Sequence, residues 1–297
     1  MAHEVPVYFG MMIATFLLPP PPAAAPDAAP TAGTFPRPAI AAVAESLQGK
    51  VAAVSGAGHG FGRQIALSLV AVGAKVYACD GPGETARKEL AALLPFVRLL
   101  PGTIEVGVVD FTDEAAVREW VALMPSLDIL VLNAGGVLGN TGQPIEEVSM
   151  SSWDDIFAVN VRSSMVAAQA SSPLLKRSTH GRIVTISSGA GLRASLTGIQ
   201  AYCSAKHALV GLTKQLAHEL GPFGVTVNSV APGLVLSNDS SRAQYNRCDE
   251  AQQKAIIEGI ALKRLGSASD IADAVLFFAS SASSWCSGQV LNVDGGR

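Results

Sequence analysis

The feature that most constrains the fold is a glycine-rich turn between a short apolar run and a helix. The run Val51–Ser55 leads into the turn, and a helix is predicted over Gly62–Val72, where Ile65, Leu69 and Val72 recur at helical spacing. The turn itself reads Ser55-Gly56-Ala57-Gly58-His59-Gly60-Phe61-Gly62. Such glycines let the backbone approach a pyrophosphate, and the helix N-terminus offers free N–H groups to phosphates. An ordinary glycine-rich turn is the alternative, but the position between strand and helix favours a dinucleotide-binding turn.

Strand-like and helix-like segments alternate from Lys50 onward. Further strands are predicted over Lys75–Asp80, Glu105–Asp110, Ile129–Asn133, Arg182–Ser187, Val225–Val230 and Gln289–Val293. Helices are predicted over Asp113–Met124, Trp153–Ser172, Tyr202–Leu220 and Ala268–Ser280. This alternation indicates βαβ units, and strands that are apolar throughout are buried on both faces. We therefore expect an α/β, single-domain Rossmann fold over residues 47–297, with a doubly wound parallel sheet of about seven strands and helices on both faces.

The first 46 residues have a different composition. An apolar run, Val7–Leu18, is followed by an Ala/Pro-rich stretch without helical or strand periodicity, so residues 1–46 are predicted to be a disordered or extended tail. The run is shorter than the roughly 20 residues of a membrane span, and no Lys or Arg precedes it as in a signal peptide. Three interpretations of the tail are open: a true extension of the protein, a segment included by an upstream start codon that is not used, and a secretory signal. The secretory signal is the least favoured. No catalytic residue is expected in the tail.

The composition excludes several classes of function. Apolar residues make up 49% of the chain and charged residues 15%, which excludes disorder of the whole chain. The net charge of -3 provides no basic field for nucleic acid or an anionic membrane. The four cysteines form no CxxC pair and the histidines lack metal-ligand spacing, so no metal site is predicted and a reducing, cytoplasmic location is expected.

The acidic residue at the end of the second predicted strand bears on cofactor choice. Asp80 lies where the adenosine ribose of a dinucleotide would lie, and a carboxylate there accepts hydrogen bonds from ribose hydroxyls and repels a 2'-phosphate. His59 is a poor substitute for the Arg or Lys that binds such a phosphate. A capping Asp ahead of Gly81-Pro82-Gly83 is the alternative. We expect NAD rather than NADP as the cofactor.

A Tyr/Lys pair opens one of the predicted helices. Tyr202 and Lys206 are four residues apart, which puts the phenol and the ammonium on one helical face. This spacing alone occurs by chance in many helices. Here the buried strand Arg182–Ser187 ends in hydroxyl groups shortly before the pair, which favours a catalytic interpretation.

From about Gly49 to Gly296 the chain resembles the short-chain dehydrogenase/reductase family of the Tyr-x-x-x-Lys type. The glycine turn is similar to that family's Thr-Gly-x-x-x-Gly-x-Gly, with Ser55 in the Thr position and Phe61 where Ile is commoner. The other matching segments are Asp110, Leu132-Asn133-Ala134-Gly135, Val159-Asn160-Val161, Ser188 with Tyr202 and Lys206, Asn228-Ser229-Val230-Ala231-Pro232-Gly233, and Val293-Asp294-Gly295-Gly296.

The resemblance implies a set of site residues. The catalytic set is Asn160, Ser188, Tyr202 and Lys206; Ser188 is chosen over Ser187 because the family's serine lies three residues before a glycine, here Gly191. The implied cofactor-binding residues are Gly56, Gly58, His59, Gly60, Phe61, Gly62, Asp80, Asp110, Phe111, Asn133, Ala134, Gly135, Tyr202, Lys206, Pro232, Gly233, Val235 and Ser237.

The chemistry expected of the catalytic set is proton transfer beside a hydride transfer. Tyr202 is the acid/base, and Lys206 together with the positive nicotinamide of NAD lowers its pKa from about 10. Ser188 holds the substrate oxygen. The resemblance implies that Asn160 interrupts its helix to hold a water that links Lys206 to solvent.

The expected function is NAD(H)-dependent interconversion of a secondary alcohol and a ketone. The alternatives are a 3-oxoacyl-thioester reductase using NADPH and a non-catalytic dinucleotide-binding regulator. The resemblance implies a substrate lid over residues 234–260, whose polar residues suit a hydroxylated or anionic substrate or a solvated surface. The resemblance implies a homotetramer that packs through the helices Trp153–Ser172 and Tyr202–Leu220. The expected partner is a small-molecule alcohol or ketone, with no nucleic acid and no membrane.

Overall fold

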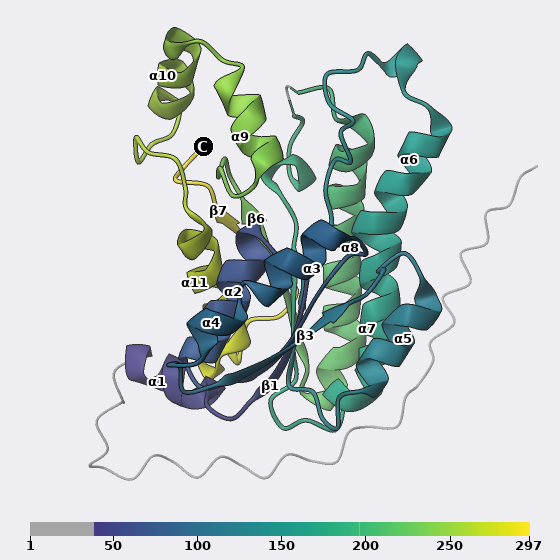
Figure 1. The fold of residues 1–297 in the computed structure, drawn as a ribbon, viewed down its shortest axis with the longest axis vertical. Helices are drawn as coiled ribbons and strands as arrows, with labels where there is room; N and C mark the ends of the chain where they lie inside the picture. Colours follow the sequence, from purple (N-terminus) through teal and green to yellow (C-terminus); the bar gives the residue numbers. More distant parts are fainter. Residues whose placement is uncertain (1–38, 196) are drawn as a thin grey trace, which may run out of the picture. The chain divides into compact units, whose positions relative to one another are not determined.

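The predicted strands pair into one parallel sheet in the computed structural model, which describes residues 39–195 and 197–297 (Figure 1). The strands are β1 (Val51–Ser55), β2 (Lys75–Asp80), β3 (Thr103–Val108), β4 (Ile129–Leu132), β5 (Arg182–Ile186), β6 (Thr226–Pro232) and β7 (Val290–Val293). Within the described residues they form a seven-stranded sheet in the order β3-β2-β1-β4-β5-β6-β7, and every pair is parallel. The order reverses beside β1, where doubly wound sheets bind their ligands. The predicted fold class is confirmed.

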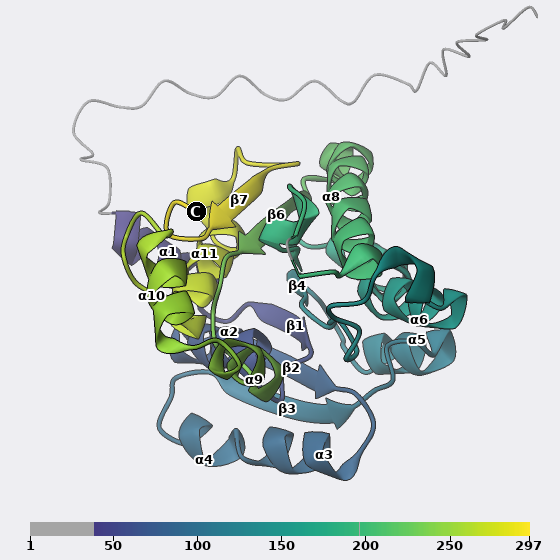
Figure 2. The same cartoon turned by 90° about the horizontal axis from the view of Figure 1, so that it is seen from above.

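Helices cover both faces of this sheet, as the view from above shows (Figure 2). They are α1 (Ala39–Leu47), α2 (Gly60–Ala71), α3 (Glu84–Ala91), α4 (Leu94–Val97), α5 (Glu114–Ala122), α6 (Met150–Phe157), α7 (Ser163–Leu175), α8 (Gln200–Leu220), α9 (Asp239–Asn246), α10 (Glu250–Glu258) and α11 (Ala268–Ala279). One core cluster joins α2 and α11 to the sheet, and a second joins α5, α7 and α8 to its other face.

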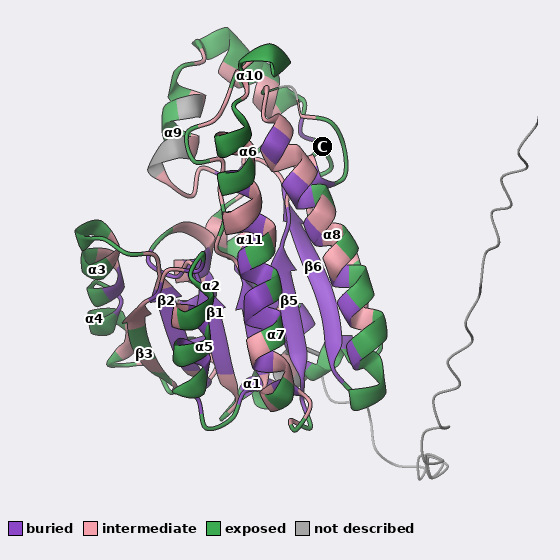
Figure 3. Ribbon diagram, turned by 90° about the vertical axis from the view of Figure 1, so that its right-hand side faces the viewer, coloured by how far each residue is buried: buried purple, intermediate pink, exposed green. Residues whose placement is uncertain are grey.

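Alternate residues of each central strand supply these two clusters. In β1, Ala52 and Val54 belong to the first cluster and Ala53 to the second, and all three are fully buried (Figure 3). A strand covered on both faces must be apolar at every position, because its side chains alternate between the faces. The continuous apolar runs in the sequence have this cause.

Most predicted elements end within one or two residues of the observed bounds, and two of the differences have a physical reason. The strand predicted over Glu105–Asp110 begins earlier, at Thr103, because β3 is an edge strand whose exposed residues do not form an apolar run. The single helix predicted over Trp153–Ser172 is α6 followed by α7, with a π-helical turn over Ala158–Arg162 between them.

The predicted tail is wrong at its C-terminal end. Residues 39–46 form most of α1, in which Val43 packs against the first core cluster and Leu47 is fully buried. The Ser46 hydroxyl also accepts a hydrogen bond from the Ser281 backbone N–H (3.1 Å). Val43 and Leu47 are four residues apart and therefore lie on one face of α1, and their packing holds this helix against the core of the domain. The rest of the predicted tail lies outside the described residues.

The strands end together at one edge of the sheet, since they are parallel. The segment between β6 and α11 forms α9 and α10 beyond this edge (Figure 1), at the place predicted for a lid. Across residues 39–195 and 197–297, no helix combines the length and apolar character that crossing a membrane requires.

Candidate active site

The glycine turn after β1 is folded so tightly that side chains are excluded from it. Gly56 and Gly60 have φ of +64° and +57°, which favour glycine. A Cβ on Gly62 would lie 2.0 Å from the Gly56 carbonyl oxygen. The glycines thus leave no side chain between a ligand and the first N–H groups of α2. This arrangement fits the pyrophosphate of a dinucleotide.

Two residues of the predicted cofactor set, Asn133 and Ala134, are hydrogen-bonded to this turn. The Ser55 hydroxyl accepts hydrogen bonds from the N–H groups of Asn133 and Ala134, both at 3.0 Å. The Asn133 amide donates to the carbonyls of Ser55 (3.0 Å) and Gly56 (2.9 Å). The ends of β1 and β4 are thereby fixed to each other at the point where the sheet order reverses.

Asp80 lies at the end of β2 and reaches the same turn. One carboxylate oxygen accepts the Gly58 N–H and the other the Gly81 N–H, both at 2.7 Å. The carboxylate thus lies beside the glycine turn, and its bond to the Gly81 N–H is local, although the N-cap of α3 is Gly83 and not Asp80.

The other predicted adenosine-side residues are placed in different ways. His59 is exposed and precedes α2 without a side-chain capping bond. The Asp110 carboxylate accepts the backbone N–H (2.8 Å) and hydroxyl (2.6 Å) of Thr112, which lowers the pKa of Asp110. Phe61 packs partly against the first core cluster, and Phe111 is buried edge-on against Trp120 with ring centroids 5.6 Å apart. Phe111 therefore has its backbone, not its ring, available to a cofactor.

Tyr202 and Lys206 lie on the first two turns of α8, on one face as predicted. The Lys206 side chain is 3% exposed, and its ammonium donates to the Ile186 carbonyl oxygen (2.8 Å). The ammonium also lies 5.5 Å from the centroid of the Tyr202 ring. The pair thus lies against the end of β5.

Burial controls the protonation of this pair. Burial raises the pKa of the Tyr202 phenol, and a hydrogen bond with Ser188 offsets part of that rise. Burial lowers the pKa of Lys206 to about 8, so the ammonium is still mostly protonated at neutral pH. The expected lowering of the Tyr202 pKa does not occur in the protein alone. Tyr202 is a protonated phenol at neutral pH, ready to donate a proton.

The adjacent serines at the end of β5 point in different directions. Ser187 is buried, and its hydroxyl donates to the Lys206 backbone carbonyl (3.2 Å). The Ser188 hydroxyl accepts the Ala190 N–H (3.1 Å) and interacts with Tyr202. Strand alternation therefore places Ser188, the predicted residue of the two, beside the phenol.

Asn160 occupies the π-helical turn between α6 and α7 and is fully buried. Its amide donates to the carbonyls of Gly136 (2.9 Å) and Ile156 (2.8 Å) and accepts the Gly136 N–H (3.1 Å). The predicted interruption of the helix is present. A Cβ on Gly135 would lie 2.5 Å from the Asn160 side-chain oxygen and 3.3 Å from the Lys206 ammonium, so these three residues meet at one point.

A cavity of about 440 Å³ lies beside the glycine turn. It is lined by Gly60, Val235, Leu236, Ser237, Arg242, Leu265, Gly266, Ser267 and Ala268. The predicted residues Val235 and Ser237 thus face Gly60, while Pro232 and Gly233 lie at the end of β6 against β7.

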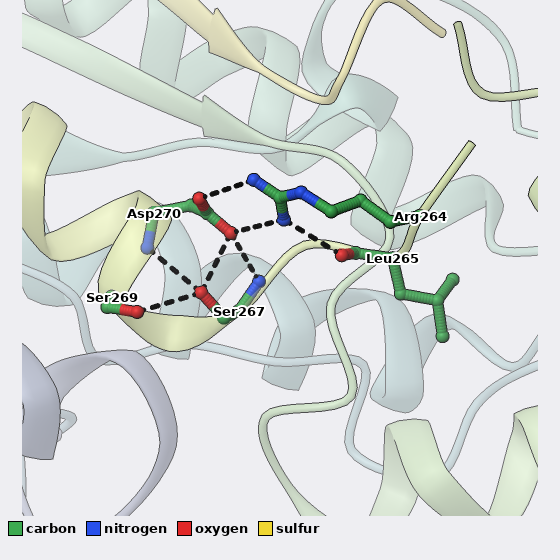
Figure 4. A network of polar contacts seen from close by, with 5 residues as sticks. All are labelled: Arg264, Leu265, Ser267, Ser269 and Asp270. Carbon is green, nitrogen blue, oxygen red and sulfur yellow. Dashed lines mark hydrogen bonds and ion pairs between the residues drawn. The ribbon is translucent and has the colours of Figure 1, made fainter. Parts of the chain in front are cut away.

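One wall of this cavity is fixed by a polar network (Figure 4). Arg264 forms two 2.9 Å bonds to the Asp270 carboxylate, which also accepts the Ser267 N–H (2.7 Å). These bonds, with Arg264 the largest cause, hold the pKa of Asp270 well below its usual range. A parallel bridge from Gly266 to Val235 connects the network to the predicted cofactor segment.

The fold agrees with the family that the sequence resembles, and comparison with known proteins shows that family. A family model described as enoyl-(acyl carrier protein) reductase matches residues 56–297. The chain belongs to the short-chain dehydrogenase/reductase family and is an NAD(P)-dependent oxidoreductase acting on CH–OH groups.

Individual relatives differ in substrate. L-xylulose reductase from Mus musculus is 37% identical over 251 residues, covering 84% of this chain and 97% of that protein. The 3-oxoacyl-(acyl-carrier-protein) reductase FabG from Escherichia coli (strain K12) is 34% identical, covering 84% and 98%. A solved 7α-hydroxysteroid dehydrogenase complexed with NADH is 30% identical with a TM-score of 0.77, covering 86% of this chain and 96% of its own.

The sequence did not point to two residues near the site. Gly136 holds both sides of the Asn160 amide through its backbone, and Glu89 of α3 reaches the glycine turn. The Asn133-Ala134-Gly135 segment could have drawn attention to Gly136, which follows it directly. No spacing rule connects Glu89 to the turn.

Proposed function

We propose that the protein interconverts a secondary alcohol and a ketone with NAD(H), using Tyr202 as the acid/base. The observation that carries this proposal is the position of the Tyr202 phenol, which interacts with the Ser188 hydroxyl and has the Lys206 ammonium 5.5 Å from its ring. A proton donor, a hydrogen-bonding hydroxyl and a buried cation are the groups that carbonyl reduction requires.

Each catalytic residue has a separate task in the proposed reaction. A nicotinamide held at this site would supply or accept the hydride. In reduction, Ser188 holds the carbonyl oxygen and Tyr202 donates a proton to it; in oxidation the phenolate takes that proton back. The Lys206 ammonium stabilises the phenolate, and its low pKa of about 8 suits it to passing a proton on. Asn160 positions Lys206 by holding the loop after β4 beside it.

Other residues are proposed to hold the cofactor. Gly56 to Gly62 and the start of α2 hold the diphosphate, and Asp80 accepts from the adenosine ribose and opposes a 2'-phosphate. Asp110, Asn133, Gly135 and the segment from Pro232 to Ser237 complete the binding site. NAD is therefore proposed over NADP, although solved relatives contain either NADH or NADP.

A polar ketone is the proposed class of substrate. The lid contributes Arg242 to the cavity beside the glycine turn, and L-xylulose reductases are among the relatives. The second candidate is a 3-oxoacyl-thioester reductase using NADPH, and the FabG relatives favour this class of substrate.

One set of assays separates these candidates. We expect NADH oxidation with short polyhydroxy ketones, and weaker activity with NADPH or with an acetoacetyl thioester. Asp80→Ala should narrow the preference for NADH over NADPH by roughly tenfold or more, because it removes a charge that repels the 2'-phosphate. Initial rates at 340 nm with both cofactors measure this. Turnover of the thioester with NADPH alone contradicts the proposal and supports the second candidate.

A homotetramer and a cytoplasmic location are part of the proposal. Met150 (67% exposed) and Met165 (43% exposed) lie on α6 and α7, the helices found at the predicted packing segment Trp153–Ser172. All four cysteines are free thiols, which suits a reducing compartment.

Light scattering coupled to size-exclusion chromatography tests the assembly. We expect a mass about four times the 30.5 kDa of the chain. The same mass should be found at micromolar and tenfold lower concentration, because an interface between permanent subunits is large. A mass of a single chain contradicts the tetramer and leaves the proposed chemistry unaffected.

A further inference from the structure

Two carboxylates from different elements meet at Gly58 of the glycine turn. A Cβ on Gly58 would lie 2.7 Å from an Asp80 carboxylate oxygen and 3.3 Å from a Glu89 carboxylate oxygen. Asp80 ends β2, whereas Glu89 lies on α3 and is only partly exposed. A side chain at position 58 would therefore collide with the two carboxylates, which converge beside the glycine backbone.

The two carboxylates differ in their hydrogen bonds. Both Asp80 oxygens accept backbone N–H groups, from Gly58 and Gly81. Glu89 makes no hydrogen bond or ion pair with any other described residue, although Glu84 of the same helix pairs with Lys88 at 3.6 Å. Glu89 thus keeps all its acceptor positions for a ligand, while Asp80 has used part of its own.

Two carboxylates at one point repel further negative charge. Among the described residues, no cation or hydrogen-bond donor pairs with Glu89, so its carboxylate is available to a donor from a ligand. A ligand with hydroxyl groups at this point supplies such a donor. A ligand with a phosphate there adds a charge of about -1.5 to -2 beside two carboxylates.

We propose that Glu89 is a second specificity-determining residue, which accepts a hydrogen bond from the adenosine ribose and opposes a 2'-phosphate together with Asp80. The inference rests on the proposed use of NAD. It goes beyond the proposed function because it assigns to a residue of α3 a part in the choice between NAD and NADP.

Fluorescence titration of the full chain with NADH and NADPH tests this role. Glu89→Gln keeps the shape of the side chain and removes its charge. We expect NADPH to bind roughly tenfold tighter to this variant and NADH a few-fold weaker, with the gain for NADPH shrinking as salt is raised. The matched control is Glu84→Gln, which makes the same change of charge on the same helix and should move both affinities less than twofold.

The outcomes separate this inference from the proposed function. If Glu89→Gln leaves the ratio of the two affinities at its wild-type value, Glu89 has no part in cofactor choice and the inference is overturned. The proposed function then stands as long as the wild-type protein prefers NADH. If the wild-type protein prefers NADPH, the cofactor choice is overturned, and tighter NADPH binding by the variant still supports the role of Glu89. An equal effect of Glu84→Gln overturns the inference, because the general field of the helix then accounts for it.

Discussion

Tyr202→Phe should abolish turnover while NADH binding survives. The substitution removes the hydroxyl that interacts with Ser188, on a ring whose centroid lies 5.5 Å from the Lys206 ammonium, so the proposed proton donor to the substrate oxygen is lost. General acid catalysis contributes roughly 10²- to 10⁴-fold, and we expect kcat to fall by about 10³-fold. The phenyl ring keeps its packing against Ile156 and Ala205, so the NADH dissociation constant should change less than about threefold. Steady-state rates and a fluorescence titration on one preparation measure both.

The same chemical change elsewhere in the protein is the control. Tyr77 on β2 is 4% exposed and belongs to the second core cluster, so Tyr77→Phe removes a hydroxyl from the fold without touching the Ser188 group. It should leave kcat within about twofold. If Tyr202→Phe keeps more than about a tenth of the wild-type kcat, another residue protonates the substrate and the proposed role of Tyr202 is wrong.

Features set by local sequence could be predicted. The β1 and β2 boundaries match because strands buried on both faces read as unbroken apolar runs. The glycine turn is predictable because a strand, a turn and a helix follow one another directly in the sequence. Tyr202 and Lys206 share a face of α8 because helical geometry fixes residues four apart. In each case the sequence pattern that predicts the feature lies within a short continuous segment of the chain.

Features set by distant contacts could not be predicted. The orientation of Phe111 depends on Trp120, and the helical start of the domain depends on the core that receives Leu47. The extent of the π-helical turn at Asn160 depends on Gly136, 24 residues away. Glu89 reaches the turn only because α3 folds back over it. The apolar pattern of the sequence does not carry this information.

The second large effect is expected at the turn itself, from Gly62→Ala. The new methyl group would lie 2.0 Å from the Gly56 carbonyl oxygen and 2.5 Å from the Asn133 amide nitrogen. The first contact is with backbone, so the turn must open, and Asn133 then loses its bonds to Ser55 and Gly56. NADH affinity should fall by roughly 100-fold, because the N–H groups that would hold the diphosphate move with the turn. Overpacking of this kind also lowers stability by about 1–3 kcal/mol.

Gly211→Ala is the matched control, because a Cβ on this α8 glycine meets nothing within 4 Å. It should leave NADH affinity unchanged. It should raise the melting temperature slightly, because alanine is more stable than glycine in the interior of a helix. Titration of Gly62→Ala well below its own melting temperature separates loss of binding from loss of fold. Weak binding by a folded variant supports a diphosphate site at the turn. Wild-type affinity in a folded variant would mean that the cofactor binds without this backbone, which contradicts the proposed site while leaving the Tyr202 chemistry to be judged by its own variant.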